Sequence, residues 1–577
     1  MAEALISPGV FLRENDLTQI SQGPITVGAA LMGPTVLGPI NIPTVVRSYS
    51  DFKSRFGAMF ITGCLNYEYL TSIAAYNYFQ QGGDSLLVTR VVSGTYTAAT
   101  ASVVGYDGTA SFSLETISEG EIMNNDFSAS TAPQGALPSG SANNVRWEVT
   151  FSDTKSGQFT LLVRRGDDYD NQKTVLETWS NLSLDPNTAN YIGYVIGDQK
   201  IVATLDENSN YYLNYSGSYQ NKSRYIRVKS VDRPLPGYID NQGRANTAYT
   251  SSLPATGSGT YNGAFGTAVG AITTGSLNLF VDIPSSTTGN IQGVSGSDYD
   301  VAISLLKSKD QFDFKTITAP GLNMQNADVQ INSLLRLAEE RGTCVAVVDP
   351  VAYGQGLTTV TNTAALFDSS YGASYWPWVQ LRSQETGKLL YCPASTVIPG
   401  VYEYNDKVAA EWFAPAGLTR GGLSTVVQPE RRLIASERDT LYANKVNPVA
   451  IFPGQGTAVY GQKTLQSKAS ALDRVNVRRL LIALKRYIGQ IAETLVFEQN
   501  SMATRNSFLS RVNPYLQYVQ QQQGLYAFRV VMDETNNSAE VIDRNQLVGA
   551  IYLQPTKTAE FVLLDFNILP TGATFGA

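Results

Sequence analysis

Residues 473–495 read DRVNVRRLLIALKRYIGQIAETL, and this stretch decides how the C-terminal part of the chain folds. Its apolar residues recur every three or four positions, which is the spacing of one face of an α-helix. They are Val477, Leu480, Leu481, Leu484, Tyr487, Ile488, Ile491 and Leu495. The other side carries cations, namely Arg474, Arg478, Arg479, Lys485 and Arg486. We therefore expect a long helix with one apolar face and one basic face.

The residues after this helix predict two shorter helices. Apolar residues at helical spacing between Arg505 and Val512 indicate the first of them. Asn513-Pro514 is typical of an N-cap followed by proline at the first helical position, and Gly524 is a typical C-terminal stop. We therefore expect Pro514 to open a separate helix rather than to kink the preceding one.

Beyond Gly524 the apolar period changes to that of β-strands. Residues 525–532 alternate, with Tyr526, Phe528, Val530 and Met532 on one face, and residues 547–553 form a second short apolar run. Residues 561–569 predict a third strand, with an apolar face made of Val562, Leu564, Phe566 and Ile568. An apolar strand near a chain end invites pairing at its open edge. We expect it to pair in this subunit or in a neighbour.

The rest of the chain alternates between an α/β pattern and a long β-rich stretch. Residues 21–93 and 297–440 alternate helices with strands, which predicts a partly parallel sheet covered by helices. Residues 94–296 are rich in Ser, Thr, Gly, Asn and Tyr and show strand patterns with few helical stripes, with a division near residue 230. We expect an α+β fold, in which a mixed α/β core from the N- and C-terminal parts carries a large β-rich insertion.

Three finer predictions complete this division. Residues 1–20 form an N-terminal arm, residues 441–557 a C-terminal inner core domain, and residues 558–577 a C-terminal arm. Residues 192–202 read as a strand of the insertion. Residues 327–341 read as a helix with Val329, Leu334, Leu335 and Ala338 inside.

Composition narrows the function classes. The 577 residues are too many for one ordinary core, and a net charge of −7 argues against nucleic-acid binding. The chain has no histidine, which excludes Ser-His-Asp and Cys-His catalysis and histidine metal sites. Its three cysteines, Cys64, Cys344 and Cys392, form no CxxC pair, and Cys344 is expected to be a buried small hydrophobe. No apolar run approaches the ~20 residues that span a bilayer, and Met1 to Val10 show no signal peptide.

A few polar residues invite a catalytic or binding interpretation. Asp349 follows an apolar strand, as catalytic acids do in many α/β folds, but a turn-forming residue before proline explains it equally well. The carboxylates of Asp167, Asp168 and Asp170 are clustered and loop-like, which argues against a glycosidase pair. Phosphate-binding and nucleophile-elbow motifs are missing. We expect no catalytic, cofactor-binding or metal-ligating residues.

Several runs together carry a resemblance to a known family. In the C-terminal part these are residues 473–480 (DRVNVRRL), 536–537 (NN) with 541–543 (VID), and 559–562 (AEFV). Upstream they are residues 7–11 (SPGVF), 375–379 (YWPWV), and 412–418 (WFAPAGL) with Arg420-Gly421. In order and spacing they resemble contractile tail sheath proteins. The resemblance does not cover residues 94–296.

The resemblance implies a structural protein rather than an enzyme. It implies a homo-oligomeric helical sheath of stacked rings around an inner tail tube, with baseplate and tail terminator proteins as further partners. Such a sheath shortens without ATP and drives the tube through the bacterial envelope for genome ejection. The resemblance further implies assembly in the host bacterial cytoplasm, a final location in the virion tail, no cofactor, no direct nucleic-acid contact and no membrane insertion.

Two sets of site residues follow from the resemblance. Sheath subunits are linked by terminal arms that complete the sheet of an adjacent core, which assigns Val10, Phe11, Leu12, Phe561, Val562, Leu564, Phe566 and Ile568 to the arms. The basic face, Arg474, Arg478, Arg479, Lys485 and Arg486, is a candidate contact with acidic groups on the inner tube. On residue patterns alone, a solvated helix face or pairing with the protein's own acids explains those cations better.

Two alternatives stay open. One is the sheath of a phage-derived secretion or toxin-delivery device. The other, of a different class, is a carbohydrate-binding or carbohydrate-cleaving tail adhesin, for which the run of Tyr211, Tyr212, Tyr215 and Tyr219 in the insertion is the main hint.

Overall fold

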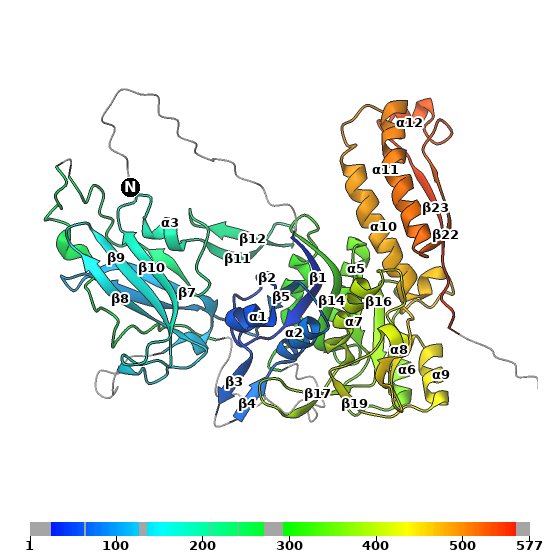
Figure 1. The fold of residues 1–577 in the computed structure, drawn as a ribbon, viewed down its shortest axis with the longest axis horizontal. Coiled ribbons are helices and arrows are strands. Elements are labelled where there is room, and N and C mark those ends of the chain that lie inside the picture. The colour runs from blue at the N-terminus through cyan, green and yellow to red at the C-terminus, as the bar shows by residue number, and fades with distance from the viewer. Residues whose placement is uncertain are drawn as a thin grey trace, which may run out of the picture.

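The computed structural model describes residues 25–62, 65–125, 135–208, 210–240, 242–270 and 292–560. Figure 1 shows a β-rich part on one side, a central sheet with helices in the middle, and an upright pair of long helices on the other side. The predicted N-terminal arm and residues 561–577 of the predicted C-terminal arm lie outside the described residues.

The central sheet has eight strands in the order β2-β5-β1-β14-β15-β16-β20-β21. The inner pairings, from β5 through β1, β14, β15 and β16 to β20, are all parallel, and β2 and β21 pair antiparallel at the two edges. The strands are β1 (Ile25–Gly33), β2 (Thr44–Val46), β5 (Leu86–Arg90), β14 (Phe312–Asn323), β15 (Val345–Asp349), β16 (Gly372–Trp376), β20 (Val446–Phe452) and β21 (Gly456–Val459). Segments far apart in the sequence thus share one sheet, which confirms the predicted mixed α/β core.

Helices cover both faces of this sheet, because alternate residues of its buried strands point to opposite sides. Ala346 and Val348 of β15 pack in the core formed with α5, whereas Val345 and Val347 pack in the core formed with α2 and α7. The helices around the sheet are α1 (Tyr49–Phe56), α2 (Leu70–Gln80), α4 (Asp300–Leu305), α5 (Asp328–Arg341), α6 (Leu357–Ala365), α7 (Ile398–Val408), α8 (Gly417–Arg420) and α9 (Ala435–Ala443). Small sheets at its border use β3 (Met59–Thr62) with β4 (Leu65–Glu68), and β17 (Val379–Arg382) with β18 (Leu389–Cys392) and β19 (Val426–Pro429).

The predicted helix over residues 327–341 is confirmed as α5, but one of its inner positions is wrong. Leu334, Leu335 and Ala338 are buried, whereas Val329 is 62% exposed. At 100° per residue Val329 lies on the far side of the helix from Leu334, so its side chain points to solvent. Cys344 is buried beside this helix, as predicted.

The insertion contains two three-stranded antiparallel sheets, β10-β9-β8 and β13-β7-β6, around one shared apolar core. Its elements are β6 (Ala98–Val104), β7 (Ala110–Glu119), β8 (Val145–Asp153), β9 (Gln158–Arg165), β10 (Val175–Ser183), α3 (Ile192–Ile196), β11 (Lys200–Leu205), β12 (Tyr211–Ser216) and β13 (Ile226–Ser230). The hairpin β11–β12 reaches from this part onto the central one, where Leu213 joins the core around α4 and α5.

The predicted strand over residues 192–202 is wrong in its first half. Residues Ile192–Ile196 form the short helix α3, and the strand β11 begins only at Lys200. Ile192 and Ile196 are four residues apart, which places both on one helix face, and both are buried. Gly197 then takes a φ of +110°, which ends the helix.

Asp349 ends the central strand β15 and is buried. Its carboxylate accepts hydrogen bonds from the Ser395 backbone N–H at 3.1 Å and from the Ser395 hydroxyl at 2.5 Å. Burial raises the pKa of Asp349 to about 7, although the bonds from Ser395 oppose that shift. The carboxyl therefore ties the end of β15 to the residues before α7, which agrees with a structural role.

Asp349 should make stability depend on pH. Because its pKa is raised in the folded chain, the native state keeps a proton that the unfolded state releases between about pH 4 and pH 7. The free energy of unfolding should therefore fall as the pH rises through that window and level off above it. Asp349→Asn should flatten part of this slope in urea unfolding followed by intrinsic fluorescence. Glu68, whose pKa burial also raises to about 7, should contribute to the same slope.

The matched control is Asp310→Asn, which removes an exposed carboxylate. It should leave the slope of the wild-type chain unchanged. An Asp349→Asn slope equal to that of the wild-type chain would contradict the assignment.

Candidate assembly site

The predicted long helix is confirmed as α10 (Val475–Glu493), and it packs beside α11 (Met502–Gln521) (Figure 1). Leu480 and Leu484 of α10 are buried against Phe508, Val512 and Leu516 of α11. Further along α10, apolar side chains are half-buried in the same contact, namely Leu481, Ile488, Ile491 and Leu495. The apolar face read from the sequence is thus the contact face of the helix pair.

The prediction that Pro514 opens a separate helix is wrong, because α11 runs through it without a break. Proline removes one backbone N–H from a helix and leaves the carbonyl four residues earlier without its partner. Pro514 lies on the exposed side of α11, where water can bind that carbonyl. The buried neighbours Val512 and Leu516 hold the helix in place on its other side.

A two-stranded antiparallel sheet, β22 (Leu525–Val531) with β23 (Ala550–Pro555), lies along the helix pair. Phe528 and Val530 of β22 and Ile551 and Leu553 of β23 pack against the helices. β23 begins three residues later than predicted. The short helix α12 (Ala539–Asp543) lies in the connection between the two strands.

Tyr526 departs from the predicted alternation and is 57% exposed. The pairing shifts register between Leu525 and Ala527, so an extra residue is inserted at Tyr526. This bulge changes the parity of the strand: Leu525, Phe528 and Val530 face the helices and Tyr526 faces away. Tyr552 of β23 is also exposed, at 62%.

Among the described residues, no third strand pairs with β22 or β23. An isolated two-stranded sheet leaves rows of backbone N–H and C=O groups open at both edges and is marginally stable by itself. Here the helix pair stabilises one face, and in the described part of the chain both outer edges carry no further strand. Sequence reasoning found these strands but had no signal for where their edges would lie.

Arg474, at the N-terminal boundary of α10, binds the carboxylate of Glu560. Its Nε and Nη2 atoms donate to the two carboxylate oxygens of Glu560, at 2.7 and 3.1 Å. Gln462 also reaches this segment, with hydrogen bonds from Nε2 to Thr558 Oγ1 at 2.6 Å and to Glu560 Oε1 at 3.1 Å. The point from which the predicted C-terminal arm departs is therefore fixed beside α10.

The arm residues themselves lie outside the described residues. They are Val10, Phe11, Leu12, Phe561, Val562, Leu564, Phe566 and Ile568.

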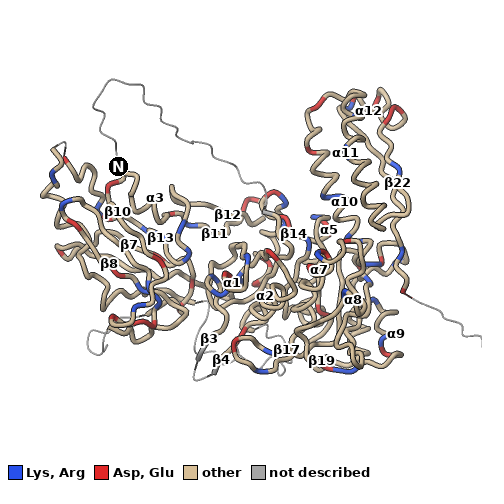
Figure 2. The backbone as a smooth tube through the Cα atoms, viewed as in Figure 1, with Lys and Arg blue, Asp and Glu red and all other residues tan. Residues whose placement is uncertain are grey.

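The cations of α10 lie where this helix meets the central part of the molecule (Figure 2). The Nη2 atom of Arg479 lies 2.6 and 2.8 Å from the carboxylate oxygens of Asp406 in α7, and both side chains are less than 10% exposed. Arg486 pairs with Asp313 of β14 at 3.0 Å.

The remaining cations of the basic face differ in exposure. Arg478 donates to the carbonyl and hydroxyl of Ser370 and stacks 3.9 Å from the Tyr371 ring centre. Burial lowers the pKa of Arg478. Lys485 is exposed, with its Nζ 3.2 Å from the Tyr371 hydroxyl.

Three of the five cations, Arg474, Arg479 and Arg486, are thus paired with the protein's own acids. Their partners Glu560, Asp406 and Asp313 were missed by sequence reasoning. They come from distant segments, and no local pattern marks them. Contact between the basic face and an inner tube stays a prediction.

The comparisons with known proteins agree with this architecture. Residues 292–465 match the phage tail sheath protein central domain, and residues 467–568 match the phage tail sheath C-terminal domain. The chain carries the central and C-terminal domains of the phage tail sheath family. The sheath C-terminal domain thus contains α10, α11, β22 and β23, the elements of the candidate assembly site.

Curated tail sheath proteins align with part of the chain. The tail sheath protein of Vibrio phage KVP40 is 40% identical over 216 residues, which are 37% of this chain and 31% of that protein. The tail sheath protein of Enterobacteria phage T4 is 39% identical over 185 residues, which are 32% of this chain and 28% of that protein. The chain therefore spans about a third of the length of these two sheath relatives.

A solved structure shares the overall fold. The sheath tail protein from Listeria innocua superposes with a TM-score of 0.52 at 11% identity, over 92% of this chain and 95% of that one. This likeness concerns the fold alone.

The adhesin alternative gains no support. Asp168 is buried and bonded to the guanidinium of Arg164, with Nη2 to Oδ1 at 2.8 Å, and Arg164 also pairs with Glu148. Asp167 and Asp170 are paired with Arg165 and Lys173. Each of these carboxylates is thus paired with a cation of the insertion.

The pair between Arg479 and Asp406 should hold the sheath C-terminal domain on the central sheet. Arg479→Gln should lower the free energy of unfolding by about 3 kcal/mol, because removal of one partner leaves a buried charge poorly compensated. Lys485→Gln, on the same helix but exposed, should change it by less than about 0.5 kcal/mol. Urea unfolding of the purified chain measures both. Equal stability of the two variants would contradict the expected role of the buried pair.

Proposed function

We propose that this chain is the subunit of a contractile phage tail sheath. It polymerises helically around the inner tail tube and contracts to drive the tube through the bacterial envelope for genome ejection. The observation that carries this proposal is the two-stranded sheet β22–β23, which has open edges within the described residues and belongs to a phage tail sheath C-terminal domain.

The proposed linkage between subunits is strand addition. An arm from a neighbour, either residues 10–12 or residues 561–568, pairs with an edge of β22–β23. Each main-chain hydrogen bond contributes a net ~0.5–1.5 kcal/mol, and apolar arm residues such as Leu564 and Phe566 add burial. Because Gln462 and Arg474 hold Thr558 and Glu560, the first residues of the predicted arm are fixed relative to the helix pair.

This arrangement suits a polymer that changes shape. The arms tether neighbouring subunits through backbone pairing, while contacts between the bodies of the subunits differ in the extended and contracted states. Energy is then stored as the difference between two sets of contacts, with no nucleotide required. The inner tube, the baseplate and the tail terminator are the further partners of the proposed sheath, which assembles in the host cytoplasm and resides in the virion tail. The sheath of a phage-derived delivery device would use the same linkage.

Removal of residues 561–577 should abolish ordered tubes in negative-stain electron microscopy. It should leave the subunit folded, because Glu560 and its bond to Arg474 are retained. Leu564→Ser combined with Phe566→Ser should act in the same direction, since both residues lie on the apolar face of the arm. The control, Asp565→Asn combined with Asn567→Asp on the opposite face, should still form tubes. Tubes of normal order from the truncated chain would contradict strand exchange.

Lys485 is the exposed member of the basic face and the remaining candidate for a tube contact. Lys485→Glu should reduce co-sedimentation of tube protein with the sheath, and most strongly at low salt, because exposed ion pairs contribute only ~0–1 kcal/mol each and are screened by ions. Lys155→Glu, an equal charge change in the insertion, should leave co-sedimentation unchanged. Equal co-sedimentation with all three proteins would rule out Lys485 as a tube contact.

A further inference from the structure

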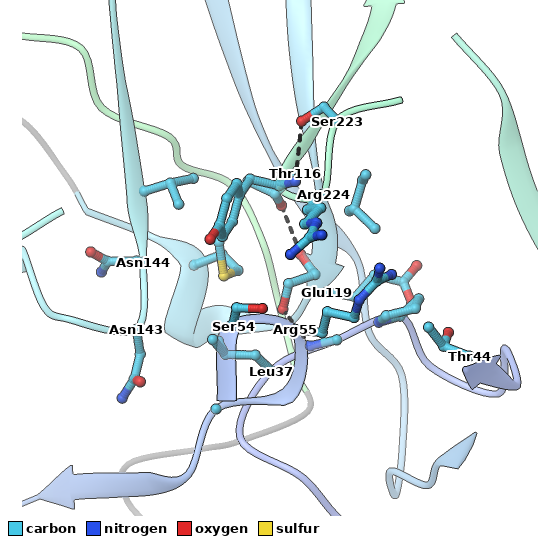
Figure 3. Close-up of a pocket in the computed structure, with 18 of the residues that line it drawn as sticks. Leu37, Thr44, Ser54, Arg55, Thr116, Glu119, Asn143, Asn144, Ser223 and Arg224 are labelled. Carbon is cyan, nitrogen blue, oxygen red and sulfur yellow. Dashed lines mark hydrogen bonds between the residues drawn. The ribbon is translucent and has the colours of Figure 1, made fainter. Parts of the chain in front are cut away.

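A cleft of about 720 Å³ lies where the insertion meets the central part of the molecule (Figure 3). Helix α1 and the chain before it line one side, and β7, the residues before β8 and the residues around Arg224 line the other. Direct contacts join the two sides, including Asn143 Nδ2 to the Met59 carbonyl at 3.3 Å and the Gly38 N–H to Ser118 Oγ at 2.9 Å. The volume falls within the ~300–1,000 Å³ that is typical of small-molecule sites.

Two guanidinium groups in this cleft share a single carboxylate. Arg55 Nε lies 3.0 Å from Asp51 Oδ1, and Arg224 Nη1 approaches the same oxygen at 3.4 Å. Arg55 comes from α1 in the central part and Arg224 from the segment before β13 in the insertion. The other oxygen of Asp51 accepts the backbone N–H of Arg47 at 3.3 Å. One negative charge therefore faces two positive ones.

A second acid, Glu177, lies beside the backbone of Arg224. Glu177 accepts the backbone N–H of Arg224 at 3.0 Å on one oxygen and the Ser223 hydroxyl at 2.6 Å on the other. Its oxygens thus bond to the chain that carries Arg224. The guanidinium of Arg224 is about half exposed toward the cleft and has donors left for a ligand.

The other cations on the cleft wall are Lys53, Arg165, Lys200 and Arg227, and three of them pair with acids. Lys53 pairs with Glu385 at 2.9 Å, and Arg227 pairs with Glu115. Glu119 accepts the Ile40 N–H at 3.1 Å, and burial raises its pKa. Arg55 and Arg224 are the two lining guanidinium groups that share one carboxylate, and Figure 3 labels both of them, with Glu119 between.

We propose that this cleft binds a small anion bearing phosphate or carboxylate groups, held between Arg55 of the central part and Arg224 of the insertion. A guanidinium has planar N–H donors whose geometry matches both phosphate and carboxylate groups. Two guanidinium groups from different parts of the chain can therefore bind one multivalent anion together. The ligand replaces the shared contact with Asp51 by a separate partner for each arginine. It thereby links the insertion to the central part.

The test is isothermal titration calorimetry of the purified full chain, at low salt, with inorganic pyrophosphate in one arm and citrate in the other. We expect saturable binding of one ligand per chain in at least one arm, and the arm that binds more tightly identifies phosphate or carboxylate chemistry. Arg224→Gln should weaken binding about tenfold or more, as expected for loss of a charge-assisted hydrogen bond. Arg55→Gln should act similarly.

The matched control is Lys229→Gln, which removes an exposed cation of β13 that does not line the cleft. It should bind like the wild-type chain. A second readout is the melting temperature, which the ligand should raise for the wild-type chain and for Lys229→Gln but not for Arg224→Gln. Absence of saturable binding in both arms would overturn the proposal. Equal affinity of Arg224→Gln and the wild-type chain would overturn it too.

Discussion

The attachment of α10 to the central sheet is the interaction on which the assembly site depends. Arg479 of α10 forms an ion pair with Asp406 of α7, and Arg486 forms an ion pair with Asp313 of β14. Arg478 donates to the Ser370 carbonyl and packs on the ring of Tyr371. Guanidinium groups suit this position because they bond to carboxylates and carbonyls while their flat faces pack on aromatic rings. The helix is thereby fixed in both position and rotation.

Because α10 is fixed, everything packed on its apolar face is fixed as well. That face carries α11, and the two helices together carry the hairpin β22–β23. The hairpin would be marginal as an isolated pair of strands. Packed on the helices, it forms a sheet whose edges carry no further strand within the described residues, and Arg474 holds Glu560 beside the same helix. A mechanical load on an arm would therefore pass through α10 to the central sheet.

Charged side chains also join two parts of the molecule at the cleft beside α1. The insertion and the central part meet there through hydrogen bonds and through two arginines that converge on Asp51. An interface of this kind is polar, and its geometry depends on how the charges are compensated. An anion bound between Arg55 and Arg224 would thus bear on how the insertion is held.

The sequence predicted features that depend on neighbouring residues better than features that depend on packing between distant segments. The apolar period of residues 477–495 predicted α10 and its contact face, because a helix repeats its neighbours every 3.6 residues. The alternation of helices and strands predicted a partly parallel sheet, and the buried Cys344 followed from its apolar strand. Local signals were misleading where packing or register intervened: Pro514 looked like a helix start, residues 192–202 like one strand, and Tyr526 like an inward residue.

The sequence by itself determined α10 with its amphipathic character, the approximate positions of β22 and β23, and the absence of histidine chemistry. Only the tertiary structure decided which cations of the basic face are paired with acids and which one is exposed. Their partners lie 73 to 173 positions away along the chain, at Asp406, Glu560 and Asp313. Periodicity reports the neighbours of a residue within its own helix or strand, whereas an ion pair between distant segments exists only once the sheet has brought them together.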